Sequence, residues 1–490
     1  MEKEILKLCA SKGFFLDKEM LGLLSGLKKE TIFDIIENLT NLDVKEKVIT
    51  KLMFDKHKEK FGWLLVDDEK IEKNDNIVKI LSPIEFSSKK REVKDFVQNF
   101  YSRYVAIKKI IEIKRLENLT SIRKIDNKGV YTIIVAVLSK KITKNKNLLI
   151  EVEDLTGNST VLVNQKDLNL FTQAKNLLLD DVIGLRVSNF GKMLFVNEII
   201  YPDSILKEKK YSNFDEYVAF SGDIHIGSKM FLEKELIRFI KWLNGEIGSE
   251  KQREIAKKVK YLFLTGDNID GVGQYPGQEN FLNIKECKKQ YEKVWEILSK
   301  IRSNVEIIMC PGQHDAVWVG EPQSPIPKKW AEELYQMKNL HLVSNPALVE
   351  IKGGFKVLMY HGASINRFIN EMPEIRINFG HRSPTRVVRE MLKRRHLSPI
   401  YGLMDYIPFT DNDPMVIDIV PDIIATADQH RAEISSYNNI LMIASSCWQS
   451  ITPFEKKVGN VPVPCRVPLF NLKTRETKII DFSSEEIKEI

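Results

Sequence analysis

The chain has 490 residues, of which 43% are hydrophobic and 29% are charged, and its formal net charge is +7. This length exceeds one ordinary domain and predicts two or three. No stretch approaches the ~20 uncharged apolar residues of a membrane-spanning helix. The N-terminus also lacks a basic segment followed by a long apolar run, so we expect neither a membrane span nor a secretory signal. The mild positive charge allows a nucleic-acid partner without requiring one.

The five cysteines are scattered and form no CxxC pair. An odd, dispersed set in a chain of this length favours a reducing compartment over a disulfide framework or a zinc ribbon. We expect small buried thiols at Cys9, Cys287, Cys310, Cys447 and Cys465.

The N-terminal residues 1–70 are expected to form a small helical domain. Apolar residues recur there at helical spacing in 4–8, 20–24 and 31–36. The next segment, 71–117, begins with a lysine-rich stretch that is typical of a linker. A connecting helix is expected from Val93 to about Leu116.

Residues 118–205 are expected to form an OB-type β-barrel. Five short β-rich runs are separated by turn residues, and this spacing is typical of a small Greek-key barrel. Such barrels often bind single strands. A purely structural barrel, used for packing against partners, is an equal alternative, because few aromatic residues could stack on bases and Phe171 and Tyr131 are the obvious candidates. The expected strands are 131–138, 148–152, 159–163, 182–187 and 193–199.

From residue 214 to 482 the pattern changes to α/β, with helical stretches such as 232–244 and 284–301 between apolar strands. Five of these strands are each followed by Asp, His or an amide. Such side chains converge where the carboxyl ends of strands meet. The expected strands are 217–220, 261–264, 305–310, 356–359 and 422–426. The polar segments that follow them are Ser221–His225, Thr265–Gly271, Pro311–Asp315, Tyr360–Gly362 and Ala427–His430.

These segments carry the chemistry of a dinuclear hydrolase, in which two metal ions clamp a phosphodiester and activate a water. Asp223 and His225 are two apart on an extended segment and can share one metal. Asp267 is placed to bridge two metals. Mixed Asp, His and amide ligands suit Mn, Fe or Mg better than a closed zinc site. His314 follows the amide position and could protonate the leaving oxygen.

The five segments together resemble the calcineurin-like phosphoesterase superfamily, whose pattern is DxH, GDxxD, GNHD, HG and GHxH. A narrower resemblance, over residues 93–482, is to the small subunits of archaeal family D DNA polymerases. The segments that carry it are 271–278 (GVGQYPGQ), 390–399 (EMLKRRHLSP), 447–450 (CWQS) and 467–472 (VPLFNL), with DFV at 95–97 and SRY at 102–104.

This resemblance implies an α/β two-sheet sandwich flanked by helices, with the OB domain attached. It also implies a 3′→5′ exonuclease with two divalent metal ions, Mn²⁺ or Mg²⁺, in the cytoplasm of an archaeal cell at the nucleoid. The implied partners are a large polymerase subunit and single-stranded or frayed 3′ ends of DNA. Asp223, His225, Asp267 and His430 would hold the first metal. Asp267, Gln313, His361 and Asp428 would hold the second, with His314 as the catalytic histidine.

Three positions around the second metal depart from the superfamily pattern. Gln313 replaces Asn, which displaces the amide oxygen by about 1.5 Å, whereas metal sites tolerate errors of only ~0.2 Å. Asp428 replaces His, and its charge lowers the metal's Lewis acidity and repels the phosphodiester. Ala427 replaces Gly and is expected to restrict the turn.

Several neighbouring residues have both a functional and a structural interpretation. Asp270 and Asp315 are expected to orient the metal-binding loops without binding a metal themselves. Arg394, Arg395 and His396 form a basic cluster that could contact the DNA backbone, or could be a solvated helix end.

Two functions from different classes therefore compete. One is an active proofreading exonuclease, which needs both metals. The other is a weakly active or inactive accessory subunit that supports the large polymerase subunit. A phosphatase of small phosphoesters is a third interpretation, which the OB-like domain and the family-specific segments argue against.

Overall fold

The computed structural model describes residues 2–13, 15–18, 21, 48–50, 78–86, 90–191 and 193–490. The chain divides into two compact units, residues 1–77 and residues 78–490. No helix in these ranges is both long and apolar enough to cross a membrane.

The first unit contains one described helix, α1 (Glu2–Ser11), and a parallel pair of two-residue strands, β1 (Phe15–Leu16) and β2 (Val48–Ile49). Helix α1 buries Ile5 and Cys9 on one face. The other expected helical segments, 20–24 (apart from Leu21) and 31–36, and the expected boundary at residue 70 lie outside the described residues.

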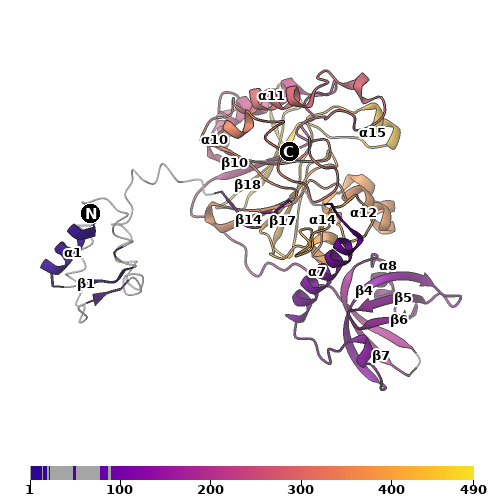
Figure 1. Ribbon diagram of the computed structural model, residues 1–490. Coiled ribbons are helices and arrows are strands. Elements are labelled where there is room, and N and C mark those ends of the chain that lie inside the picture. Colours follow the sequence, from indigo (N-terminus) through magenta and orange to yellow (C-terminus); the bar gives the residue numbers. More distant parts are fainter. Residues whose placement is uncertain are drawn as a thin grey trace. The chain divides into compact units, whose positions relative to one another are not determined.

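The second unit begins with a strand, a long helix and a closed five-stranded barrel (Figure 1). The five strands lie where the sequence predicts them, and α8 between β6 and β7 is an addition. The barrel order is β4-β5-β6-β8-β7, and β6 and β8 pair in parallel. Alternate side chains such as Leu148, Ile150 and Val152 fill the interior, as the two-residue period of a strand requires. The bounds are β3 Lys79–Ile80, α7 Val93–Glu112, η1 Ile122–Lys124, β4 Gly129–Ile142, β5 Leu148–Asp154, β6 Gly157–Val163, α8 Leu168–Lys175, β7 Val182–Asn189 and β8 Leu194–Ile200.

The rest of the second unit is a sandwich of two mixed sheets. One sheet has seven strands in the order β12-β11-β10-β9-β18-β19-β20, and the other has six in the order β16-β17-β15-β14-β13-β3. The strand bounds are β9 Tyr217–Ser221, β10 Val259–Thr265, β11 Glu306–Cys310, β12 Leu340–Leu342, β13 Ala347–Ile351, β14 Phe355–Met359, β15 Ile423–Thr426, β16 Glu433–Tyr437, β17 Ile440–Ala444, β18 Arg466–Asn471, β19 Thr477–Asp481 and β20 Lys488–Glu489.

Helices cover the outer faces of both sheets. Strand β10 shows why: Phe263 packs between the sheets, whereas Leu262 and Leu264 pack in the cluster that contains the helices α9–α11. Helices α12 and α14 pack over the six-stranded sheet. The bounds are α9 Glu233–Leu243, α10 Glu250–Lys258, η2 Gln278–Phe281, α11 Cys287–Leu298, η3 Leu334–Gln336, η4 Lys352–Gly354, α12 Ile365–Glu371, α13 Pro373–Asn378, η5 Gly380–Arg382, α14 Thr385–Arg394 and α15 Pro453–Val458.

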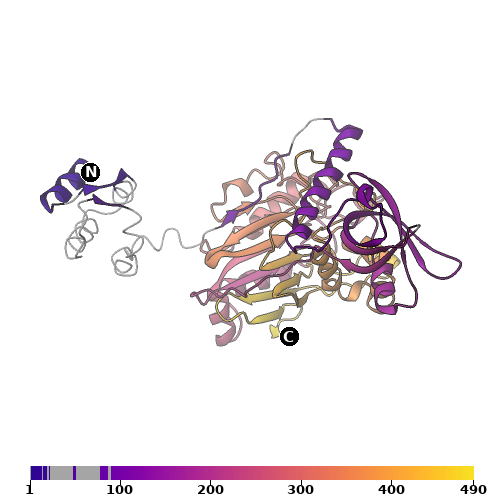
Figure 2. The ribbon, with the colours of Figure 1, turned by 90° about the horizontal axis from the view of Figure 1, so that it is seen from below.

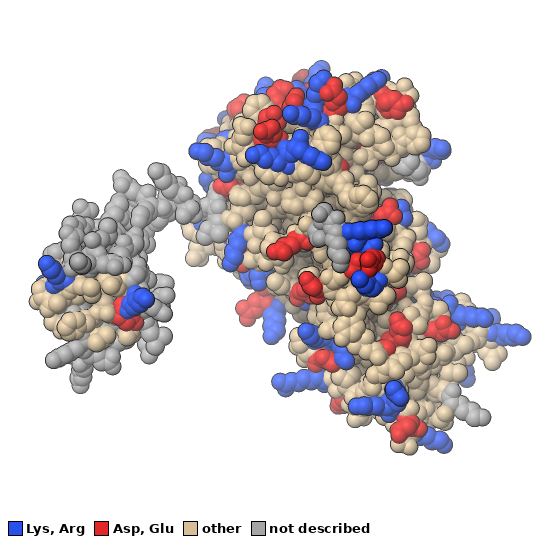
Figure 3. Space-filling view, in the orientation of Figure 1, with Lys and Arg blue, Asp and Glu red and all other residues tan. Residues whose placement is uncertain are grey.

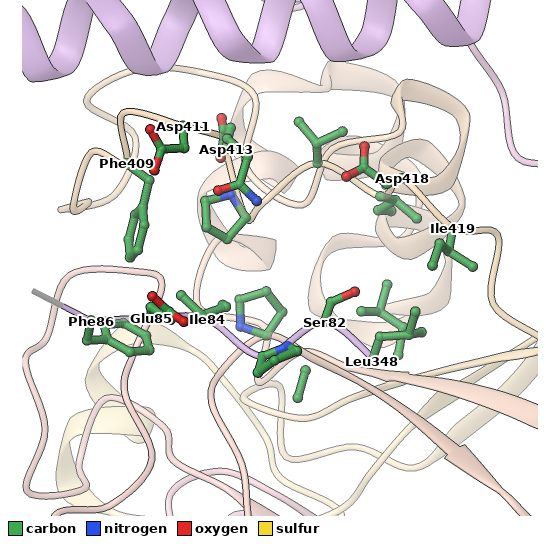
Figure 4. Close-up of a pocket in the computed structure, with 18 of the residues that line it drawn as sticks. Ser82, Ile84, Glu85, Phe86, Leu348, Phe409, Asp411, Asp413, Asp418 and Ile419 are labelled. Atoms are coloured by element: carbon green, nitrogen blue, oxygen red, sulfur yellow. The ribbon is translucent and has the colours of Figure 1, made fainter. Parts of the chain in front are cut away.

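The segment expected to be a linker contributes an edge strand. Strand β3 pairs antiparallel with β13, through Ile80 opposite Val349. Beyond it, Ser82–Phe86 runs beside the loop that carries Phe409, Asp411 and Asp418, and together they line a pocket of about 530 Å³ (Figure 4). None of the residues that line this pocket is histidine or cysteine. It is therefore not the place where the predicted metal ligands meet.

Helix α7 lies between the barrel and the sandwich (Figures 1 and 2) and is fixed there by a buried carboxylate. Asp413 Oδ2 accepts hydrogen bonds from Arg103 Nε at 2.6 Å and Asn99 Nδ2 at 3.2 Å, both on α7. The same oxygen lies 3.0 Å from His396 Nε2, beyond the end of α14. Arg103 and His396 lower the pKa of Asp413 against the opposing effect of burial, so it is held as a buried anion.

The structure contradicts the interpretation of Arg394, Arg395 and His396 as DNA contacts. Their exposed fractions are 3%, 5% and 1%. Arg394 pairs with Asp181 of the barrel at 3.0 Å and with Glu390 at 2.5 Å. Arg395 donates to the carbonyl oxygen of Asp418 at 2.8 Å. These cations satisfy buried acceptors at the junction of barrel and sandwich, where a phosphate backbone has no access to them.

This junction predicts a dependence of stability on pH. Burial, followed by the charge of Arg103, lowers the pKa of His396 from its ordinary 6.5 to about 4. The folded state therefore holds a neutral ring, and its contribution is complete above pH 6.5 and is lost as the pH falls towards 4. The loss is at most about 3 kcal/mol.

We expect urea unfolding to show a smaller loss of stability between pH 6.5 and pH 4 for His396→Gln than for the wild type. His341→Gln, at a half-exposed position, gives the baseline for the loss of one imidazole. An equal loss in wild type and His396→Gln would contradict a neutral buried His396.

Candidate metal centre

The five polar segments predicted from the sequence meet at one edge of the sandwich. They follow β9, β10, β11, β14 and β15, whose carboxyl ends point the same way within each sheet. A cavity of about 590 Å³ opens there. Its walls include His225, Asp267, Gln313, Asp428 and His430. On the face seen in Figure 3, basic and acidic side chains are interspersed over barrel and sandwich.

Left-handed backbone turns aim these side chains at one another. The φ angles are +47° at Asp223, +54° at His225, +48° at Asp267, +64° at Asp428 and +53° at His430. Such values are uncommon outside glycine, and their grouping at one site is typical of a functional centre.

Two glycines provide the space that these turns need. A Cβ at Gly266 would lie 2.3 Å from His361 Nδ1, and one at Gly312 would lie 2.2 Å from Asp267 Oδ1. Any larger residue would push these ligands out of place.

Asp223, His225 and His430 form the first cluster, with one ligand atom of each within 4.8 Å of the others. Asp270 lies 3.1 Å from His225 Nδ1, and Glu455 lies 2.8 Å from His430 Nδ1. Although burial acts to raise the pKa of each of these two carboxyl groups, its histidine partner lowers it below the ordinary value. Ionised carboxylates only accept, so both Nδ1 atoms carry hydrogen.

The two remaining imidazole nitrogens of this cluster face each other. His225 Nε2 and His430 Nε2 are 3.2 Å apart. Two acceptor lone pairs at this distance repel unless a proton or a metal cation lies between them. Asp223 Oδ1 is also buried without a hydrogen-bond partner, and burial raises the pKa of Asp223 to about 7. The cluster therefore has the donor set and the unmet need for positive charge of a metal site.

Asp223, Asp267 and His361 form a second cluster, again within 4.8 Å. His361 Nδ1 lies 2.9 Å from the carbonyl oxygen of Thr265, so Nδ1 is the nitrogen that donates. The other nitrogen, Nε2, is buried without a hydrogen bond, 3.3 Å from Asp267 Oδ2. Asp223 belongs to both of these clusters, and Asp267 belongs to a further one with His225 and His314, so either carboxylate can lie between two cations.

The departures from the superfamily pattern lie beside this second cluster. Asp428 Oδ1 is 3.8 Å from His361 Nε2, and Oδ2 accepts from Asn366 at 3.2 Å and from Gln429 at 2.6 Å. Gln313 is half-buried in the cavity wall. Ala427 is not among the residues with positive φ, so the turn does not need glycine there and the expected restriction is absent.

His314 is held from both sides. Its backbone N–H donates to Asp267 Oδ1 at 2.8 Å, and its ring Nδ1 lies 2.8 Å from the carbonyl oxygen of Asp270. A carbonyl only accepts, so Nδ1 carries hydrogen and Nε2 is the nitrogen left to exchange a proton with a ligand. Although burial acts to lower the pKa of His314, the charges of Asp267 and Asp270 raise it overall.

Asp270 and Asp315, the two carboxylates expected to orient the loops, both form hydrogen bonds to residues of the five segments. Asp270 holds His225, as described above. Asp315 Oδ2 accepts from the backbone N–H groups of Gly312 at 2.9 Å and Asn268 at 3.1 Å, so it joins two of the five loops. Tyr291 on α11 donates to its other oxygen at 2.8 Å.

Sequence reasoning missed Glu455, which orients His430. The signal was present as the capping box Thr452–Glu455 at the start of α15. That pattern predicts where a helix begins, but it does not show that the glutamate faces a histidine 25 residues earlier.

Comparisons with known proteins agree with the sequence resemblance. The model of the B-subunit family of DNA polymerases alpha and epsilon matches residues 218–435. The DNA polymerase II small subunit of Methanothermobacter thermautotrophicus is 36% identical over 80% of this chain and 80% of that protein. The protein of the same name from Archaeoglobus fulgidus is 38% identical over 78% of this chain and 76% of its own length. The protein of the same name from Pyrococcus furiosus is 33% identical over 80% of this chain and 64% of its own length.

Among solved structures, the chain is similar to Vps29 of Entamoeba histolytica complexed with zinc, at 14% identity and a TM-score of 0.28. That match covers 56% of this chain and 97% of the other, and it is too remote to bear on function. The similarity to the archaeal small subunits is much stronger, because the sequence identity exceeds 30% and extends over most of both sequences. The chain therefore belongs to the family of archaeal DNA polymerase II small subunits.

Proposed function

We propose that this chain is the small subunit of a heterodimeric replicative DNA polymerase and that its metal centre is a 3′→5′ exonuclease. Its substrates would be single-stranded or frayed 3′ ends of DNA. The observation that carries the proposal is the pair of buried clusters, which share Asp223 and lie beside one open cavity whose walls include His225, Asp267 and His430. Two adjacent cations at a shared carboxylate are the arrangement that phosphodiester hydrolysis uses.

The donor atoms fit two divalent ions, with Mn²⁺ or Mg²⁺ favoured by the share of oxygen ligands. Asp223, His225, Asp267 and His430 would hold the first ion, and Asp267, Gln313, His361 and Asp428 the second. Bound ions would polarise the phosphodiester and lower the pKa of the attacking water. The orphaned Asp223 Oδ1, His361 Nε2 and facing imidazoles support this assignment, because each needs positive charge.

The chain's own groups would supply the protons and the geometry. Water oxygen would attack phosphorus and lose a proton to solvent, the bond from phosphorus to the 3′ oxygen would break, and that oxygen would take a proton from His314 Nε2, which solvent then restores. The product is a 5′-mononucleotide and a strand shortened by one. The hydrogen bond from His314 Nδ1 to the carbonyl oxygen of Asp270 keeps Nε2 available for this transfer.

The five-stranded barrel is proposed to be of the OB type, because β6 and β8 pair in parallel and α8 connects β6 to β7. It would support binding of DNA or of the large polymerase subunit. These partners would place the chain with the nucleoid in the archaeal cytoplasm.

An accessory subunit without significant nuclease activity is the second candidate. It is favoured by Gln313 and Asp428, because both departures fall at the second ion and Asp428 already accepts two amide hydrogen bonds.

Nuclease activity separates the two candidates. We expect the purified chain, alone and with its large subunit, to shorten 5′-labelled single-stranded DNA from the 3′ end when Mn²⁺ is added. His314→Ala should lower kcat by about 10²-fold or more, the usual value of a general acid. Activity no higher than that of His314→Ala would leave the accessory role as the function.

The carboxylate behind His430 gives a second prediction. Glu455→Gln keeps the capping box, because glutamine caps as glutamate does, but it removes the anionic partner of the imidazole. We expect Mn²⁺ affinity, measured by calorimetry, to fall about 10- to 100-fold with little change in thermal stability. Unchanged affinity would show that His430 is not a ligand. Glu433→Gln is the control, because that carboxylate also accepts hydrogen bonds, from Ser383 and Thr385, but does not line the cavity.

The departures at the second ion give a third prediction. Gln313→Asn with Asp428→His restores the superfamily pattern, so we expect the Mn²⁺ concentration at half-maximal activity to fall several-fold. Equilibrium dialysis should show tighter binding of a second ion per chain, with the first unchanged. The same midpoint in a folded double variant would mean that the native ligands already suffice.

A further inference from the structure

A second groove adjoins the metal cavity and is aromatic. It has a volume of about 540 Å³, and Val319 and Met404 line both it and the cavity. Its other walls include Phe96, Trp318, Tyr401 and Tyr406. The proposed chemistry of the metal centre makes no use of this groove.

Two of these aromatic side chains are open to solvent. Trp318 is 71% exposed and Tyr401 is 56% exposed. An exposed tryptophan contributes little to folding, so its large apolar face is available to a ligand. Trp318 follows His314 by four residues in the same loop, which links the groove to the proposed acid.

The loop that carries Trp318 is fixed. The indole lies against Gly320, where a Cβ would come within 2.9 Å of Trp318 Nε1. The carbonyl oxygen of Trp318 accepts a hydrogen bond from Gln323 at 3.2 Å. The backbone of Glu321 pairs with the opposite wall, donating to the carbonyl oxygen of Asp405 at 3.0 Å.

The opposite wall is rigid as well. Tyr401 and Tyr406 pack edge to face, with ring centroids 5.9 Å apart. Phe96 of α7 packs against Tyr406 at 5.6 Å. A preformed aromatic site loses little entropy when a flat ligand stacks in it.

The charges around the groove distinguish a base from a phosphate. Asp405 is the only ionisable acid or base among its lining residues apart from the tyrosines, so the groove itself does not attract phosphate. Arg367 lines the adjoining metal cavity, and its guanidinium donates to the carbonyl oxygen of Leu403, next to Met404. The guanidinium of Arg367 therefore lies at the boundary between the groove and the metal cavity, where a phosphate between consecutive nucleotides would pass.

We propose that this groove is a nucleobase subsite for the single strand whose 3′ end occupies the metal centre, with Trp318 as the stacking platform. The inference rests on the proposed function and adds a positioning residue to it. Base-on-aromatic stacking tolerates every base, which suits an enzyme that degrades strands of any sequence.

The first experiment measures binding without hydrolysis. The full-length chain is titrated into fluorescein-labelled oligo(dT) in a buffer that contains a metal chelator, and the fluorescence anisotropy is recorded. We expect Trp318→Ala to weaken binding about 10-fold or more and Trp318→Phe to recover most of it, because phenylalanine keeps a stacking face. Trp295→Ala, at a 40% exposed tryptophan on α11, is the matched control and should bind as the wild type does.

The second experiment measures hydrolysis with Mn²⁺. Trp318→Ala should raise KM for the oligonucleotide about 10-fold with kcat nearly unchanged. It should leave hydrolysis of the p-nitrophenyl ester of thymidine 5′-monophosphate unchanged, because that substrate carries a single nucleotide. A uniform loss on both substrates would show that the loop merely supports His314, and would overturn the subsite.

The outcomes separate this inference from the proposed function. Binding that depends on Trp318 in a chain without nuclease activity would reject the exonuclease and keep the subsite. Active nuclease with equal binding and KM in Trp318→Ala would reject the subsite and keep the exonuclease. If Trp318→Ala weakens only the complex with the large subunit, the groove is a protein interface and the subsite is wrong.

Discussion

The candidate metal centre contains an excess of buried hydrogen-bond acceptors, and the structure around it depends on them. The facing imidazole nitrogens of His225 and His430, the free oxygen of Asp223 and the free nitrogen of His361 converge where water has little access. Unpaired polar groups in such a place cost several kcal/mol unless positive charge balances them. The left-handed turns, the close-fitting glycines and the carboxylates behind the histidines all serve to hold this otherwise unfavourable arrangement.

The barrel is joined to the sandwich by a second set of buried charges, and these form ion pairs. Arg394 reaches Asp181 of the barrel, and Arg103 of α7 reaches Asp413 of the sandwich. Removing one partner of such a pair leaves an uncompensated buried charge, so the junction tolerates little displacement. Because α7 is fixed in this way, its Phe96 can form part of the aromatic groove beside the metal cavity.

The sequence predicted the parts of the fold that depend on local pattern. Residues 217–220 of β9 and 261–264 of β10 are continuous apolar runs, and the polar residues that follow them had to meet at one edge of the sheet. The roles of Arg394 and His396 were not predictable, because Asp181 is more than two hundred residues from Arg394 and no local pattern pairs them. Strand β3 was also missed, since two residues carry no period.

The two clusters differ in what supports their histidines. In the first, ionised Asp270 and Glu455 back His225 and His430, which makes each Nε2 a stronger donor of electrons to a metal. In the second, His361 Nδ1 donates to the neutral carbonyl oxygen of Thr265, and the nearby Asp428 accepts hydrogen bonds from the side-chain amides of Asn366 and Gln429. Under the proposed assignment the first ion is held more tightly than the second. The asymmetry therefore extends beyond Gln313 and Asp428 to the residues behind them, which indicates a second ion that exchanges more readily while the first remains bound.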